Sequence, residues 1–314
     1  MSNKTIAKFF RFVILIAVAS ATGCSFLASQ GSTQPEFDRD GSPYEAPVIR
    51  GRIESRAIKE SSGLAASKCQ PGVLWTHNDS GDKAIIFAVD PAGKDLGSWA
   101  VTNAENRDWE DIAAFKSENG ECFIYIGDIG NNDNKRDRTT VYRVKEPTAG
   151  AAVGEGREAS RTEAAEIINV EYPGPRPDAE TLMVHPRTGD IYIVTKRVDG
   201  PATVYKIAPE FGKNVKAVNV AEIRVPSVPN GLLSGGDISP DGLRVAICDN
   251  VAGYELVLPS GSANFEDIWL QKPLKFDAGD RKNGESIAYS HSGDSILAGS
   301  EGKNSPIFEL KRRK

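Results

Sequence analysis

Apolar residues in the sequence occur in short runs, and one pattern of them recurs from residue 47 to the end of the chain. Each copy opens with a small or acidic residue and an apolar pair, passes through a turn that ends in glycine, and closes with an apolar strand that has a polar end. The five copies begin at Ser61, Trp109, Ala179, Gly235 and Gly284. Each copy therefore predicts an antiparallel hairpin.

The spacing of the copies predicts a β-propeller. Their apolar anchors are Leu64, Ile112, Leu182, Ile238 and Ile287, which are 48, 70, 56 and 49 residues apart. Between the copies lie further strand-like runs, which gives four short strands per repeat, as in propeller blades. We therefore expect an all-β fold with five four-stranded blades over residues 47–314. Six blades are the alternative if the long second repeat, with its insertion near 149–162, contains a degenerate blade.

The last copy lacks an outer strand, because only SPIFELK follows its hairpin. The segment VIRGRIESR from Val48 can supply it, and the N-terminal strand would then close the ring and remove a free sheet edge. No long segment has the apolar periodicity of a helix, which argues against an α/β enzyme fold.

The composition agrees with this fold. Thirty glycines and 18 prolines in 314 residues indicate many turns, and 39% hydrophobic residues are enough for a packed core. The net charge of −5 and the absence of a basic stripe exclude nucleic acid as an expected partner.

The first 23 residues read as an export signal. Lys4, Lys8 and Arg11 precede a short apolar run that suits a secretory signal but is too short to span a bilayer. The sequence Ala-Thr-Gly before Cys24 resembles the lipobox of bacterial lipoproteins, with Ala21 where leucine is usual. The resemblance implies lipidation of Cys24, and Ser25 after it favours the outer membrane if the source has one. The alternative is an ordinary secretory signal with Cys24 as a spare thiol.

Residues 24–46 are rich in Ser, Gln, Gly and Pro and predict a flexible tether behind the lipidated cysteine. Loss of residues 1–23 would change the net charge from −5 to −8, so acyl chains rather than charge would hold the domain at a bacterial envelope membrane. In that oxidising compartment Cys69 and Cys122 can form a disulfide. Cys248 lies in a buried-strand pattern. No cluster of Cys and His indicates zinc, and no motif indicates a nucleotide or haem.

The hairpin geometry brings polar residues of all repeats to one end of the propeller. The first strand of each hairpin starts where the second ends, and inner strands line the central channel. The candidate site residues at this mouth are Glu110, Asp111, Glu180, Glu285, Asp79, Asp128, Asp249, Asn78, Asn131, Lys196 and His77. So many carboxylates need either a hard cation such as Ca²⁺ or pairing with Lys196 and nearby arginines. The alternative is that these residues cap turns and join blades, an equal alternative for Asp79, Asp128 and Asp249.

The motifs DWEDIA at 108–113, DAETLM at 178–183 and GESIAY at 284–289 resemble those of phytase-like β-propellers, described as having esterase-like activity of phytase. The resemblance implies an exported propeller with metal- or phosphate-directed residues at the channel mouth. The matching positions are Glu110, Glu180 and Glu285, with Asp128 and Lys196 at the strand ends. The consecutive aspartates before Pro-Ala of true propeller phytases are absent, so phytate hydrolysis is not expected.

Three functions follow from these observations. The first is a lipid-anchored propeller whose acidic mouth binds a cation, a small ligand or an envelope protein. The second is a calcium-dependent hydrolase of phosphate esters or lactones, with metal-activated water as the nucleophile. The third is a purely structural envelope protein.

Overall fold

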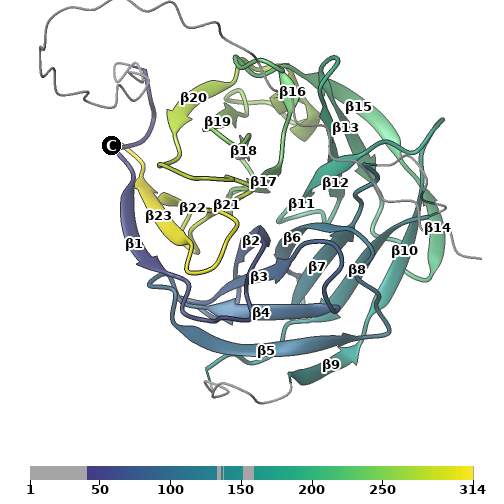
Figure 1. The fold of residues 1–314 in the computed structure, drawn as a ribbon. Coiled ribbons are helices and arrows are strands. Elements are labelled where there is room, and N and C mark those ends of the chain that lie inside the picture. Colours follow the sequence, from purple (N-terminus) through teal and green to yellow (C-terminus); the bar gives the residue numbers. More distant parts are fainter. Residues whose placement is uncertain (1–40, 133–135, 137, 151–158, 314) are drawn as a thin grey trace, which may run out of the picture. The chain divides into compact units, whose positions relative to one another are not determined.

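The computed structural model describes residues 41–132, 136, 138–150 and 159–313. The predicted signal peptide, Cys24 and most of the predicted tether lie outside these residues. The described chain is a five-bladed β-propeller, as the sequence predicts, with the inner strand of each blade nearest the centre of the ring (Figure 1). Among the described residues there is no helix with the length and apolar character needed to cross a membrane.

The blades follow one another along the chain, and each is an antiparallel sheet that runs from the channel outward. Blade 1 contains β2 (Ser61–Ala66), β3 (Leu74–Asn78), β4 (Ile85–Val89) and β5 (Asp95–Thr102). Blade 2 contains β6 (Trp109–Lys116), β7 (Cys122–Asp128), β8 (Thr139–Lys145) and β10 (Glu166–Glu171). Blade 3 contains β11 (Ala179–Val184), β12 (Ile191–Arg197), β13 (Ala202–Ile207) and β15 (Val218–Ile223), with the short β16 (Gly231–Leu232) beside β12. Blade 4 contains β17 (Gly235–Ile238), β18 (Arg244–Cys248), β19 (Ala252–Val257) and β20 (Leu274–Asp277).

Blade 5 combines the two ends of the described chain. It contains β21 (Ser286–Tyr289), β22 (Ser295–Gly299), β23 (Pro306–Lys311) and, as the outer strand, β1 (Val48–Arg52). Strand β1 pairs antiparallel with β23, with Ile49 opposite Phe308, which confirms the predicted closure by the N-terminal strand. The contact continues beyond β1, where the Glu45 amide donates to the Lys311 carbonyl at 2.8 Å.

Two insertions add a fifth strand to the preceding blade. Strand β9 (Ser160–Ala164) pairs in parallel with β5, and β14 (Lys213–Lys216) pairs in parallel with β10. The insertion in the second repeat thus covers the edge of blade 1 and does not form a sixth blade. Each of these strands pairs with the blade before its own, and the spacing of the repeats does not predict such pairing.

The segment 265–276 is one of the strand-like runs between the copies, but in the structure it forms a 3-10 helix followed by β20. The helix, η1 (Phe265–Leu270), begins after Asn264, whose side chain accepts from the Glu266 amide. Its Trp269 is buried against Tyr192 of blade 3, with ring centroids 5.6 Å apart. Packing between two blades therefore overrides the strand-like alternation of this segment.

The hydrophobic core lies between adjacent blades. Trp75 of blade 1 and Trp109 of blade 2 belong to one buried cluster, and similar clusters join the following blades. Cys69 and Cys122 form a disulfide between the β2–β3 connection and the start of β7, so it links blades 1 and 2. Cys248 is a buried free thiol in blade 4.

Candidate functional site

Two glutamates reach the channel mouth from β-bulges. Trp109 lies opposite Asp128 and Asp111 opposite Gly127, so Glu110 is an extra residue in β6. Glu180 is the extra residue at the same place in β11, between Ala179 and Thr181. A bulge breaks the alternation of side chains along a strand and re-aims the extra one. The bulges therefore direct both carboxylates into the mouth.

A second pair of carboxylates, Asp108 and Asp178, precedes these glutamates by two residues and was not among the predicted site residues. Both stand one residue before an inner strand, at the start of β6 and of β11. The signal was present in the sequence as the shared D-x-E spacing of DWEDIA and DAETLM. Sequence reasoning missed it because position 108 falls outside the strand pattern on which the repeat was aligned.

Asp79, Asp108 and Glu110 form the tightest group of carboxylates. One oxygen of each lies within 4.8 Å of the others. Glu110 is only 4% exposed, and no donor among the described residues hydrogen bonds to its carboxylate or to that of Asp108. Asp79 accepts one bond, from the Ser80 amide at 2.5 Å. Three acidic groups thus converge, and among the described residues only the Ser80 amide donates a hydrogen bond to their carboxylates.

This convergence changes how the carboxylates titrate. Burial raises the pKa of Glu110 well above its usual range, and the neighbouring charges of Glu180 and Asp79 raise it further. Burial also raises the pKa of Asp79 and of Asp108. A buried carboxylate without a positive partner either keeps its proton or binds a cation.

The opposite side of the mouth contains one lysine among further carboxylates. Lys196 Nζ contacts both carboxylate oxygens of Glu180 at 2.5 Å. Burial raises the pKa of Glu180 to about 7 although Lys196 lowers it. Burial, followed by the charge of Glu301, raises the pKa of Glu285 to about 8. Lys196 therefore forms its ion pair with Glu180, and no cation among the described residues forms an ion pair with Glu110.

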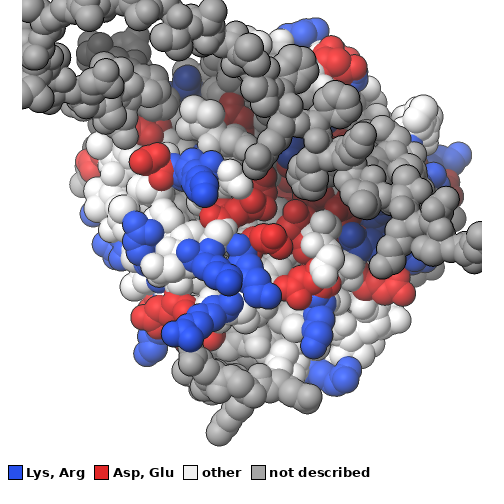
Figure 2. Space-filling view, in the orientation of Figure 1, with Lys and Arg blue, Asp and Glu red and all other residues white. Residues whose placement is uncertain are grey.

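We call this set of residues the acidic mouth. It consists of Asp79, Asp108, Glu110, Asp178, Glu180, Lys196, Glu285 and Glu301. Figure 2 shows acidic side chains gathered at the centre of the propeller face, with basic side chains around them. Glu110, Glu180, Glu285, Asp79 and Lys196 were predicted from the repeat, and the structure brings them together.

Asp128 and Asn131 border the mouth and hold its rim. Asp128 accepts from the Arg136 guanidinium at 2.7 Å and from the Asp108 amide at 2.9 Å. The Asn131 amide donates to Asp178 at 2.7 Å, and the Asn131 side chain accepts from the Arg136 amide. These bonds fix the positions of Asp108 and Asp178.

Asp111, Asn78 and Asp249 serve the fold instead. Asp111 is buried and accepts from the Leu182 amide of blade 3 at 2.9 Å, so it joins two blades. Asn78 accepts from the Lys59 and Glu60 amides. Asp249 accepts from two amides of its own turn and from the Tyr254 hydroxyl at 2.7 Å. The turn-capping alternative therefore describes Asp249.

His77, which was expected at the mouth, lies in the core between blades instead. It is fully buried, with its ring 5.7 Å from that of Trp109, and its Nδ1 contacts the Asn78 carbonyl at 3.0 Å. Burial lowers the pKa of His77 to about 4, so the ring is neutral at pH 7. Trp109 is buried with it and is not placed to stack on a ligand. Both rings pack against each other in the core between blades 1 and 2.

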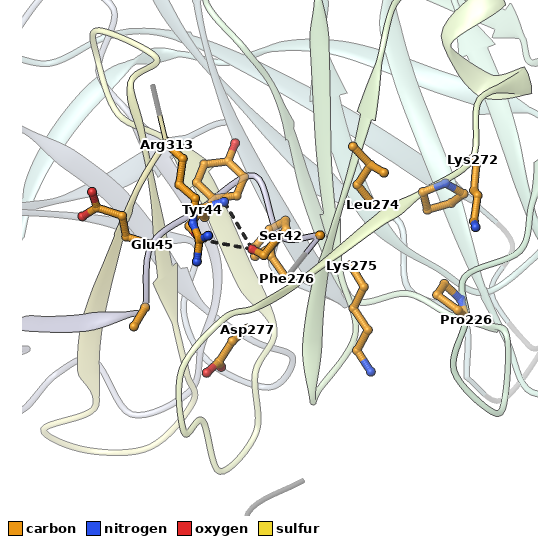
Figure 3. A pocket seen from close by; sticks show the side chains of 13 residues that line it. Ser42, Tyr44, Glu45, Pro226, Lys272, Leu274, Lys275, Phe276, Asp277 and Arg313 are labelled. Carbon is orange, nitrogen blue, oxygen red and sulfur yellow. Dashed lines mark hydrogen bonds between the residues drawn. The ribbon is translucent and has the colours of Figure 1, made fainter. Parts of the chain in front are cut away.

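A pocket of about 570 Å³ lies away from the mouth, at the outer edge of blade 4. It lies between β20 and the segment that precedes β1, and Figure 3 shows Tyr44 and Arg313 beside Phe276 there. Its place on the outside of the ring separates it from the acidic mouth.

No protein-family model matches this chain, and a search of the curated proteins finds no relative. The residues of the acidic mouth must therefore be interpreted from their own geometry.

Proposed function

We propose that the acidic mouth binds a divalent cation, with Ca²⁺ as the best fit. The observation that carries this proposal is the group of Asp79, Asp108 and Glu110, whose oxygens lie within 4.8 Å of one another while Glu110 is buried without a donor among the described residues. Calcium prefers carboxylate oxygens in a flexible arrangement of six to eight ligands. The group supplies three such side chains, and water can complete the shell.

The donor set argues for a hard cation. All three side chains offer oxygen, whereas Zn²⁺ and copper favour nitrogen and sulfur ligands. Among the described residues, Lys196 forms its ion pair with Glu180 and not with Glu110, which leaves the Glu110 carboxylate available to a bound cation. His77 is buried in the core and is therefore not available as a general base at the mouth.

Calorimetric titration of the full-length protein with CaCl₂ at pH 7.5 is the test. We expect saturable binding, and the variant Glu110→Gln is expected to weaken it by about 100-fold, because it removes a charged ligand. Glu222→Gln on the exposed outer strand β15 is the matched control and should bind like the wild type. Equal calcium affinity in Glu110→Gln and Glu222→Gln, or no binding to the wild type, would contradict the proposal.

We also propose that the protein is exported and anchored by lipid on Cys24, which places the acidic mouth in the cell envelope. The support is the sequence alone: a positive and apolar leader followed by Ala-Thr-Gly-Cys. Diacylation of Cys24 should appear as an added mass on the N-terminal peptide and should vanish in Cys24→Ser. An unmodified thiol at Cys24 in membrane-extracted protein would refute it.

A further inference from the structure

A second pocket lies at the opposite end of the propeller axis from the acidic mouth. The inner strands start at the acidic mouth, so the turns after them lie at the other end of the channel. The turns or adjoining strand ends of all five blades line this pocket, which has a volume of about 540 Å³. A cavity to which every blade contributes lies on the axis of the ring.

The charges in this pocket have the opposite sign. Lys68, Lys116 and Arg187 line it, and Glu118 is its one acidic residue among those described. Lys116 and Arg187 have exposed side chains and form no ion pair with the rest of the described chain. Two positive charges in one cavity thus have no ion-pair partner among the described residues, and Glu118 offsets only part of them.

Lys68 forms part of the floor of this pocket. Its ammonium lies 4.0 Å from Asp237, which also accepts from the Tyr289 amide of blade 5 at 3.0 Å. Asp237 therefore draws Lys68 inward and offsets part of its charge. Lys116 and Arg187 then supply most of the positive field that a ligand would meet.

The remaining walls are apolar, with one oriented histidine. Phe115, Pro186 and Pro240 line the pocket. The Nδ1 of His291 lies 2.8 Å from the Ser67 carbonyl, which can only accept, so Nδ1 carries a proton and Nε2 is the ring nitrogen left for a ligand. Cavities of several hundred cubic ångströms with apolar walls and a few polar groups are typical of small-molecule sites.

We infer that this basic pocket binds a small organic anion, a carboxylate or phosphate group on an apolar body. The anionic group would lie against Lys116 and Arg187, whose charges attract it, and the apolar body against Phe115 and the two prolines. The site is independent of the cation proposed for the acidic mouth, because it shares no residue with that mouth.

Ligand-observed NMR titrations of the full-length protein with phenyl phosphate, benzoate, inorganic phosphate and benzyl alcohol test this inference. We expect phenyl phosphate or benzoate to bind with a dissociation constant at or below about 1 mM. Inorganic phosphate and the uncharged alcohol should bind more weakly, since each lacks half of the recognised chemistry. The stronger of the two aromatic anions identifies the preferred charged group.

Variants that remove a positive charge and a variant that removes a negative charge make the test selective. Lys116→Ala with Arg187→Ala should weaken binding by about tenfold, and Glu118→Gln should strengthen it by about two- to threefold. Lys94→Ala, in the exposed β4–β5 connection, is the matched control and should bind like the wild type. Glu110→Gln should leave anion binding unchanged, so failure of the calcium site and failure of this site are distinguishable.

Three results would overturn the inference. They are aromatic anions that do not bind up to about 10 mM, benzyl alcohol that binds as tightly as the anions, and anion binding unaffected by the double alanine variant.

Discussion

Replacing Arg312 by methionine is expected to lower the free energy of unfolding by about 3 kcal/mol, because it leaves a buried carboxylate without its main cation. That carboxylate is Glu255 of blade 4, which is 0% exposed. Arg312 NH1 contacts its two oxygens at 2.7 and 2.5 Å from the end of blade 5. The Tyr44 and Tyr289 hydroxyls donate to it as well, at 2.5 and 3.0 Å.

This hydrogen-bond and ion-pair network around Glu255 stabilises the closure of the ring. Tyr44 comes from the segment before β1, Glu255 from β19 and Arg312 from the residues after β23, so one carboxylate joins both ends of the described chain to blade 4. Arg312 is partly exposed, but Glu255 is not, and Arg244 would remain as a more distant cation at 3.9 Å. The loss therefore arises from the poorly compensated buried charge rather than from the ion pair itself.

Urea unfolding followed by tryptophan fluorescence measures the effect. Arg224→Met, on an exposed residue after β15, is the control and should change stability by less than about 0.5 kcal/mol. Combining Arg312→Met with Glu255→Gln should restore part of the loss, since the buried charge is then gone. If Arg312→Met were as stable as Arg224→Met, the network would not support the closure.

The second large effect is a loss of stability as the pH rises from 6.5 to 8 in protein freed of divalent cations. The pKa values of Glu180 and Glu285 are about 7 and about 8, against 4.5 for an ordinary glutamate. In this interval the unfolded chain has both groups ionised, whereas the folded chain still binds part of their protons and releases them as the pH rises. The folded state therefore binds more protons, and its stability falls as the pH rises.

The expected fall is about 2–3 kcal/mol, from 1.36 kcal/mol per pH unit and group up to each folded pKa. The slope from these two groups should fade above pH 8 and vanish by about pH 9. The opposite effect of His77, whose pKa is lowered from 6.5 to about 4, is small in this window, because most of its destabilising effect is already gone at pH 6.5.

Chemical denaturation at pH 6.5, 7.25 and 8 in EDTA measures this slope. Glu285→Gln should flatten it, because the amide does not ionise. Calcium in place of EDTA should raise stability most at pH 8, where the carboxylates are free to bind it. A stability that stays constant or rises over this interval in EDTA would show that the mouth carboxylates are ionised at ordinary pH and need no cation.

The repeat predicted the parts of the structure that depend on local pattern. Five hairpins, their order and the N-terminal strand of the last blade follow from alternating apolar residues, and the hairpin geometry placed Glu110, Glu180 and Glu285 at one mouth. The hairpin pattern recurs in five repeats, so each copy supports the interpretation of the others.

Features that depend on neighbouring blades were missed. The bulges that aim Glu110 and Glu180 have no signature in the hydrophobic pattern. The fifth strands β9 and β14 each pair with the blade before their own, and the repeat pattern does not predict such pairing. The burial of His77 depends on packing between two blades, which the sequence of one repeat does not predict. Asp108 and Asp178 were within reach, because the D-x-E spacing recurs in two repeats.

The most direct test of the central claim is the anomalous scattering of calcium in crystals of the full-length protein grown with CaCl₂. The account predicts a peak between Asp79, Asp108 and Glu110, with carboxylate oxygens at about 2.4 Å from the ion. A fully occupied calcium site elsewhere on the protein, or an acidic mouth without a peak at saturating calcium, would contradict it.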